Sequence, residues 1–183
     1  MKEIKNEAIV LLIKIIGGLL IIAASGLLGI VYSNRLSQRH KELISLRRYM
    51  QMLETEVTYG ATPLPAALEN ISGKAEGMLS DFFSCIAESL TGRSFYTVLE
   101  AWTYGADAVL GQSTLKKADL ELIKSFGSIL GCSDREDQKK HFELFYLQLK
   151  HQEDVALEEM KKSSKMYSSL GFLLGIAVFI VLV

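Results

Sequence analysis

The three histidines are the residues whose chemistry would suit a metal site or a proton transfer, but their spacing favours neither role. His40, His141 and His151 are far apart in the sequence and fall on predicted exposed or half-exposed helix faces. His151 and Asp154 are three residues apart and could share one face of a helix. Because a lone pair of this kind is far more often solvated than ligating, we predict no metal site.

Pairs of carboxylates can perform acid–base catalysis, and Glu54 and Glu56 are the nearest candidates. Residues i and i+2 of a helix do not face each other, so these two cannot work as a pair. The GxxxxGK[ST], GxSxG and HExxH motifs are absent. Cys85 and Cys132 form no CxxC and are expected to be free thiols. We therefore predict a non-enzymatic protein without catalytic residues, cofactor or small-molecule substrate. The alternative is a small membrane enzyme with a polar pocket in its helical bundle.

The composition indicates a helical protein in which apolar and charged stretches are segregated along the chain. Its 183 residues suit one domain with short additions. Hydrophobic residues make up 49%, charged residues still make up 22%, and the mean hydropathy is +0.23. A formal net charge of −1 argues against nucleic-acid binding. Two prolines and few valine or threonine runs argue against an all-β fold.

Two uncharged segments near the ends of the chain predict transmembrane helices. Residues 15–34 and 166–183 contain no charged side chain, and about 20 apolar residues cross a bilayer as a helix. Residues 1–14 then form an N-terminal tail. The first segment is longer than the apolar part of a signal peptide and lacks a convincing cleavage site. We therefore expect it to be retained, with cleavage as the alternative.

Basic residues predict the orientation of the middle segment. They cluster just after the first span and just before the second, whereas the C-terminal end has none. Lysines in the N-terminal tail partly oppose this pattern. Because basic loops stay on the cytoplasmic side of a membrane, residues 35–165 are predicted to be cytoplasmic.

Small residues at four-residue spacing predict where membrane helices pack closely. Ser25, Gly29 and Ser33 repeat along the first span, and Gly171 and Gly175 form a GxxxG motif in the second. The alternative is that glycine is simply common in membrane helices. Homo-oligomerisation stays open.

The middle segment is predicted to be a series of helices with an aromatic core. Residues 35–58 carry a heptad stripe, formed by Leu36, Leu43, Leu46, Met50, Leu53 and Val57. Further helices are expected from Thr62 to Gly73, from Met78 to Leu90, after Ser94, from Ser113 or Thr114 to Gly131, and from Asp134 towards the second span. The expected core aromatic residues are Phe82, Phe83, Phe95, Trp102, Phe126, Phe142 and Phe145.

Glycine, proline and capping side chains mark the junctions between these helices. Gly60 is expected to be a left-handed cap, and proline is tolerated in the first turn of the next helix. Ser133 and Glu136 match a capping box, in which each side chain bonds a free backbone N–H. The expected junction residues are Gly60, Pro63, Gly92, Ser94, Gly131, Ser133 and Glu136.

Three segments together resemble the stage III sporulation protein AB family of endospore-forming bacteria. They are residues 35–68, 92–102 and 130–145, and they contain the strings ETEVTYGATPLPAAL and LGCSDREDQ. The resemblance extends over nearly the whole chain, including both terminal spans. The family's middle domain is similar to the cytoplasmic domain of platform proteins in type II secretion and type IV pilus systems. The resemblance therefore implies an all-α fold, with a compact cytoplasmic bundle of about six helices flanked by N-terminal and C-terminal transmembrane helices.

The resemblance also implies a function. The protein would be a platform or adaptor subunit of the secretion-like channel complex between mother cell and forespore, needed for endospore formation. It would lie in the mother-cell membrane surrounding the forespore. There it would link a cytoplasmic ATPase, stage III sporulation protein AA, to ring and channel subunits. The alternative is a platform subunit of an ordinary type II secretion or type IV pilus machine, although those usually carry two such domains and three spans.

Exposed charges on the first and last helices are the candidate contacts with the ATPase. As a hypothesis, the docking residues are Arg47, Arg48, Glu54, Glu56, Asp134, Arg135 and Asp137.

Overall fold

The fold is known here from a computed structural model, which describes the backbone of residues 2–92, 97–130 and 135–182. Side chains are described for residues 15–18, 27, 29–92, 97–130, 137–163 and 166. Within these ranges every regular element is a helix, which confirms the predicted all-α class. The chain divides into two compact units, one formed by residues 38–157 and the other by residues 1–37 and 158–183.

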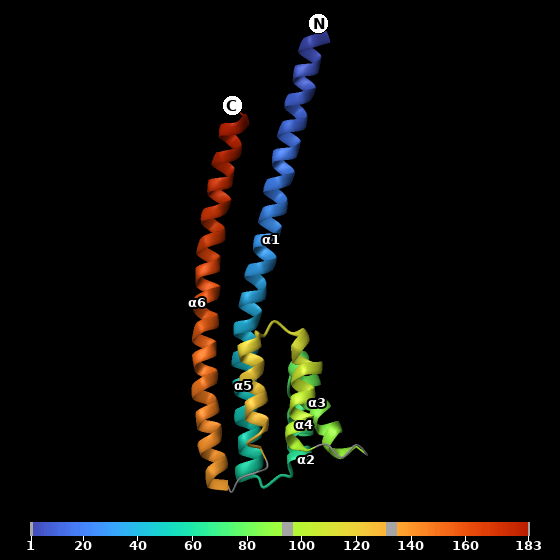
Figure 1. The fold of residues 1–183 in the computed structure, drawn as a ribbon, viewed down its shortest axis with the longest axis vertical. Coiled ribbons are helices and arrows are strands. Elements are labelled where there is room, and N and C mark those ends of the chain that lie inside the picture. The colour runs from blue at the N-terminus through green and yellow to red at the C-terminus, as the bar shows by residue number, and fades with distance from the viewer. Residues whose placement is uncertain (1, 93–96, 131–134, 183) are drawn as a thin grey trace. The chain divides into compact units, whose positions relative to one another are not determined.

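The elements of the described ranges follow a simple order along the chain. They are α1 (Lys2–Glu54), the π-helical turn η1 (Thr55–Tyr59), α2 (Leu64–Ser72), α3 (Met78–Thr91), α4 (Val98–Ala108), the 3-10 turn η2 (Leu110–Gln112), α5 (Lys117–Gly127) and α6 (Arg135–Leu182). Within the unit formed by residues 38–157, α2 packs on α3, α3 on α4, and α4 on α5 (Figure 1).

The predicted heptad stripe forms the buried face of α1. Leu43, Leu46, Met50 and Leu53 are completely buried, and Val57 is half-buried against the same core. Side chains three and four residues apart lie on one side of a helix, so this spacing places them all towards the neighbouring helices.

The junction at Gly60 differs from the left-handed cap expected from the sequence. Gly60 has a right-handed φ of −75°, and Ala61 is the residue with positive φ, at 49°. The backbone of η1 closes with a hydrogen bond from the Gly60 N–H to the Thr55 carbonyl at 3.0 Å. A Cβ on Gly60 would lie 2.7 Å from the Glu56 carbonyl oxygen. Glycine is therefore required here by close backbone approach, not by its φ angle.

The next two junctions lie near their predicted positions. Pro63 is the N-cap of α2, and Pro65 lies in the first turn of that helix, where a missing N–H costs nothing. Gly92 caps the C-terminus of α3, and its N–H donates to the Glu88 carbonyl at 2.8 Å.

The helices α4 and α5 start later than expected. Thr97 is the N-cap of α4, and it forms a capping box with Glu100. Ser94, the expected cap, lies outside the described residues. The helix α5 begins at Lys117, because the Asp119 carboxylate accepts the N–H of Lys116 at 2.7 Å.

The end of α5 lies near the second gap in the description, at residues 131–134. The helix α5 ends at Gly127 instead of Gly131. Gly131 and Ser133 fall outside the described residues, as does the side chain of Glu136.

Aromatic rings join the helices of the bundle from α3 to α6. The Trp102 ring on α4 lies edge-on to Phe82 of α3, with centroids 5.3 Å apart, and 5.8 Å from Phe126 of α5. Phe126 lies 4.5 Å from Phe145 of α6. The Trp102 indole N–H donates to the Ile123 carbonyl at 2.7 Å, so the buried ring leaves no polar group unpaired. The predicted aromatic core is confirmed except at Phe95, which lies outside the described residues.

Candidate functional site

A buried ion pair connects α1 and α5. Arg39 and Asp119 are 2% and 0% exposed, and the guanidinium donates to the carboxylate from Nε at 2.7 Å and from Nη2 at 2.8 Å. Arg39 Nη2 also lies 3.3 Å from the Gln152 side-chain oxygen on α6. Asp119 also accepts the backbone N–H of Lys116, the N-cap residue of α5. One buried arginine therefore holds three helices together.

The sequence contains a signal for the buried position of Arg39. Leu46 and Leu53 repeat every seven residues on the buried face of α1, and Arg39 occupies the preceding position of the same repeat. A charged residue at a core position of a heptad stripe needs a buried partner, because an isolated buried charge is too costly. The identity of that partner could not be read from the sequence.

Glu153 is a second charged residue within an apolar stripe. It lies between Leu149 and Ala156 on the buried face of α6 and is 2% exposed. Arg47 Nε lies 2.9 Å from the Oε1 atom of Glu153, and the two side chains form an ion pair. This oxygen accepts no hydrogen bond from the described residues. The His40 ring Nδ1 lies 3.2 Å from the Glu153 backbone carbonyl. These contacts pair α1 with α6.

Three of the proposed docking charges have partners in segments of the chain distant from them in sequence. Besides Arg47, Glu54 accepts a hydrogen bond from the Tyr146 hydroxyl at 2.9 Å. Glu56 accepts one from the Asn70 amide at 2.9 Å and lies 3.5 Å from Lys74 Nζ. Burial and the Glu54 carboxylate raise the pKa of Tyr146. Glu54 and Glu56 thus face different partners, as expected for residues two apart.

The other proposed docking residues lie on the surface or outside the description. Arg48 donates to the Tyr49 hydroxyl at 3.0 Å, with its side chain exposed. Asp137 lies 3.3 Å from Lys140 Nζ in an exposed pair. Asp134 is not described, and Arg135 is described in its backbone alone.

The small residues proposed for helix packing are described only in part. Gly29 is buried and Ser33 is half-buried. The side chain of Ser25 is not among those described. Gly171 and Gly175 are described only as part of the helical backbone of α6.

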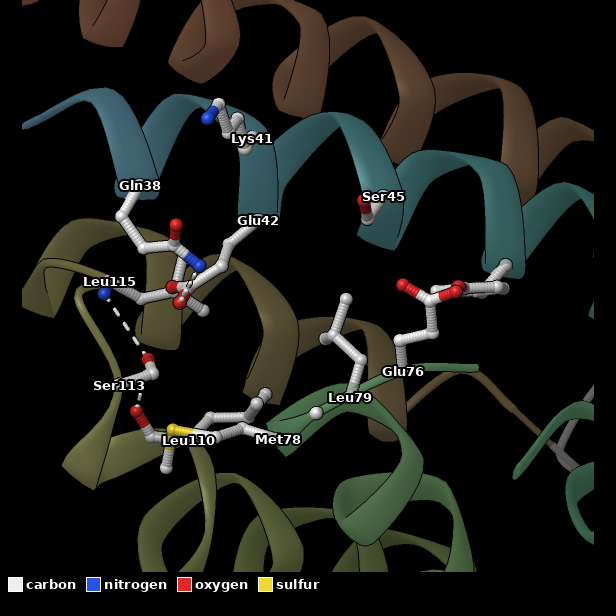
Figure 2. A pocket seen from close by; sticks show the side chains of 12 residues that line it. Gln38, Lys41, Glu42, Ser45, Glu76, Met78, Leu79, Leu110, Ser113 and Leu115 are labelled. Carbon is white, nitrogen blue, oxygen red and sulfur yellow. Dashed lines mark hydrogen bonds between the residues drawn. The ribbon is translucent and has the colours of Figure 1, made fainter. Parts of the chain in front are cut away.

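A groove of about 470 Å³ runs along the side of α1 within the unit formed by residues 38–157. Figure 2 shows Gln38 and Glu42 of α1 pointing towards Leu115 and Ser113, and Leu110, Met78 and Leu79 lie across from α1 on the same side as Ser113. The complete lining consists of Gln38, Lys41, Glu42, Ser45, Tyr49, Glu76, Gly77, Met78, Leu79, Leu110, Ser113 and Leu115. No sequence pattern indicated this groove, because its walls come from three separate parts of the chain.

The groove has the chemistry of a binding surface. Its ionisable side chains are Lys41, Glu42, Glu76 and Tyr49, and no histidine or cysteine lines it. Across the residues that the structure describes, no three side chains of histidine, cysteine, aspartate or glutamate gather in a way that could hold a metal ion. Its leucines, Leu79, Leu110 and Leu115, are at most 9% exposed, so polar and charged side chains supply much of the accessible lining.

No helix within the described part of the chain is long and apolar enough to cross a membrane. Most side chains of the two predicted spans, residues 15–34 and 166–183, lie outside the description.

Comparison with known proteins identifies relatives that match over most of the chain. The family model for stage III sporulation protein AB matches residues 14–183. Stage III sporulation protein AB of Bacillus subtilis (strain 168) is 32% identical over 171 residues, which cover 93% of this chain and 99% of that protein. A solved structure of stage III sporulation protein AB (SpoIIIAB) superposes with a TM-score of 0.64 at 31% identity. That match covers 68% of this chain and 97% of the solved one.

Proposed function

The chain belongs to the stage III sporulation protein AB family, and from this membership we propose that it is a non-enzymatic platform subunit of a channel complex between mother cell and forespore. The observation that carries the proposal is the match to residues 14–183, which spans the helical bundle and both predicted membrane segments. A role in sporulation follows from the family. The relatives are named as sporulation proteins, not as enzymes.

The proposed place of action is the mother-cell membrane around the forespore. Residues 15–34 and 166–183 would anchor the chain, and residues 35–165 would face the cytoplasm. The uncharged runs at both ends and the basic residues on their inner flanks support this topology. Its test is labelling with a membrane-impermeant thiol reagent when the chain, with Cys85 and Cys132 replaced by serine, is produced in the cell membrane of vegetative cells; a thiol placed at Glu69 should be shielded and one added after Val183 should react.

The proposed task is to link a cytoplasmic ATPase, stage III sporulation protein AA, to membrane subunits of the same complex. A rigid bundle suits an adaptor, because a movement or force at one end is transmitted to the other end only if the helices keep their relative positions. The buried pair Arg39–Asp119 and the half-buried pair Arg47–Glu153 connect α1 to α5 and to α6. Exposed charges such as Arg48 and Asp137 remain candidate contacts.

Co-purification tests the adaptor role directly. The tagged full chain, co-expressed with the AA-type ATPase and extracted from membranes in detergent, should retain the ATPase through washing. A chain that inserts and folds but never retains the ATPase would refute the link while leaving the family assignment intact.

A further inference from the structure

One exposed face of α1 is basic and has an apolar residue at its centre. Lys41, Ile44 and Arg48 are all exposed, and Ile44 exposes 41% of its surface. Residues three, four and seven apart lie on one side of a helix, so these three side chains follow one another along α1. We call them the basic row.

One exposed face of α4 carries the opposite charge at the same spacing. Glu100, Tyr104 and Asp107 are exposed, and Tyr104 exposes 53% of its surface. Glu100 accepts hydrogen bonds from Thr97 through its Oε2 atom, and Asp107 pairs with Lys124 through Oδ1. The other oxygen of each carboxylate has no donor among the described residues, so it can accept from a partner. We call this face the acidic row.

The helices that carry the two rows run in opposite directions. α5 is bonded to α1 and runs in the same direction as α1 (Figure 1). Near the end of α4, Asp107 pairs with Lys124 of α5. Nearer its start, α4 places Trp102 against Gly127, which lies further along α5. α4 is therefore antiparallel to α5 and to α1, so two copies in the same orientation present the rows to each other in matching order.

The two rows also lie at similar levels of the bundle. Lys124 follows Asp119 by a distance of about 7.5 Å along α5, at 1.5 Å per residue. Since Arg39 is the partner of Asp119, the same step along α1 starts at Arg39 and ends at Ile44. Asp107, the partner of Lys124, therefore lies near the level of Ile44. Copies that stand side by side would bring the rows within about one helical turn of alignment.

We propose that the chain associates head to tail with further copies of itself, through the basic row of one copy and the acidic row of the next. The facing pairs would be Lys41–Asp107, Ile44–Tyr104 and Arg48–Glu100. A symmetric pair is disfavoured, because joining two basic rows or two acidic rows places like charges together. Because the two surfaces differ, the contact can repeat from copy to copy. The inference goes beyond the proposed link to an ATPase and does not depend on it.

The proposed contact is small. Three side chains from each copy cover far less than the roughly 800 Å² per partner that a stable interface buries, and exposed ion pairs add little affinity. The association is therefore weak between freely diffusing chains. Copies anchored in one membrane would share an orientation and have a high effective concentration. For this reason the test uses the full-length chain inside cells.

Cross-linking between two differently tagged copies tests the proposal. In both copies serine replaces Cys85 and Cys132. One copy carries Ile44→Cys and the other carries Tyr104→Cys, and a membrane-permeant bis-maleimide is added to cells that produce both. We expect a product of twice the chain mass that carries both tags. The matched control replaces Tyr104→Cys by Leu147→Cys, a 72% exposed position on α6, and should give at least about tenfold less product.

Charge changes in the same pair of copies test the ion pairs. Lys41→Glu in the Ile44→Cys copy should lower the cross-linked fraction roughly threefold or more, because an attraction becomes a repulsion. Asp107→Lys in the Tyr104→Cys copy should then restore the product. Lys140→Glu makes the same charge change at an exposed position on α6 and should leave the yield unchanged. Circular dichroism of each purified chain checks that it is folded.

Three outcomes would overturn the proposal. The first is that folded chains give no product between positions 44 and 104. The second is an equal yield with the Leu147→Cys control, which would show chance collision without a specific face. The third is efficient dimer formation by the Ile44→Cys copy alone, which would show a symmetric pair of α1 helices.

Discussion

Arg39 and Asp119 are 80 residues apart in the sequence and form an ion pair with two hydrogen bonds. Both side chains are almost fully excluded from solvent. Arg39 also contacts Gln152, and Asp119 also caps the first turn of α5. The Oδ2 atom of Asp119 therefore accepts both from Arg39 Nε and from the Lys116 backbone N–H. A buried pair of this kind adds little net stability as a whole, but the loss of one partner is costly.

The first prediction is that Arg39→Met lowers the free energy of unfolding by about 3–5 kcal/mol, because Asp119 would remain buried without its cation. Denaturant unfolding of the full chain in detergent, followed by circular dichroism, measures this change. The double variant Arg39→Met/Asp119→Leu should recover most of the loss, apart from the cap on α5. A single variant as stable as the wild type would show that water reaches Asp119.

The second prediction concerns the contact between α5 and α4. A Cβ on Gly127 would lie 2.6 Å from the Trp102 Cδ1 and Cγ atoms. The ring cannot move away without losing its bond to the Ile123 carbonyl, so Gly127→Ala should cost about 1–3 kcal/mol through overpacking. Thermal unfolding measures it. Gly111→Ala is the control, because its nearest neighbour would be 3.9 Å away, and an equal loss there would contradict this reasoning.

The third prediction concerns the cap of α4. Thr97 Oγ1 accepts the Glu100 N–H at 3.2 Å, and the Glu100 carboxylate accepts the Thr97 N–H at 2.9 Å. Thr97→Ala should therefore destabilise the chain by about 1 kcal/mol, whereas Thr97→Ser should retain the cap. Denaturant midpoints of the two variants measure the difference. Ser94→Ala should leave the denaturant midpoint unchanged. A lower midpoint for this variant would indicate that Ser94 caps the helix.

The fourth prediction concerns the pH dependence of stability. The Asn70 amide holds the pKa of Glu56 below its ordinary value of 4.5, with a smaller contribution from Lys74. Because the pKa is lowered in the folded state, this stabilisation is complete above about pH 4.5 and is lost as the pH falls through the folded pKa. Asn70→Ala should raise the pKa of Glu56 towards 4.5 and flatten the acid limb of the stability curve.

Carboxyl NMR titration of Glu56 measures the pKa directly. In a Glu56→Gln background, Asn70→Ala should no longer alter the acid limb, because the titrating group is absent. A change that persists in that background would assign the effect to another carboxylate.

The elements that the sequence predicts best are those with strong periodicity. The α1 stripe of Leu43, Leu46 and Met50 is buried as expected, because a seven-residue repeat places side chains on one face whatever the partner is. The start of α4 was less predictable. Ser94 and Thr97 can both cap a helix, and only Thr97 is followed by an acidic residue at the third position, Glu100. The sequence therefore holds a signal that favours Thr97 over Ser94 as the cap.

The candidate site is harder to predict than the fold, because it depends on pairing across the chain. Local spacing shows that Arg39 and Glu153 interrupt apolar stripes, but it does not show that their partners are Asp119 and Arg47. The exposed charges chosen from the sequence included Glu54 and Glu56, which the folded chain uses internally. The groove is formed by segments that only tertiary packing brings together.

The contacts between α1 and α6 also constrain the order of folding during synthesis, because they can form only after α6 has been made. His40 contacts the Glu153 carbonyl across 113 residues of sequence. At synthesis rates of about 5–20 residues per second, α1 leaves the ribosome roughly 6–23 s before its partner segment exists. During that interval the leucine stripe of α1 has no α6 to cover it. The nascent chain therefore passes through a stage in which α1 to α5 are present but the core residues Phe142, Phe145 and Leu149 of α6 are still missing.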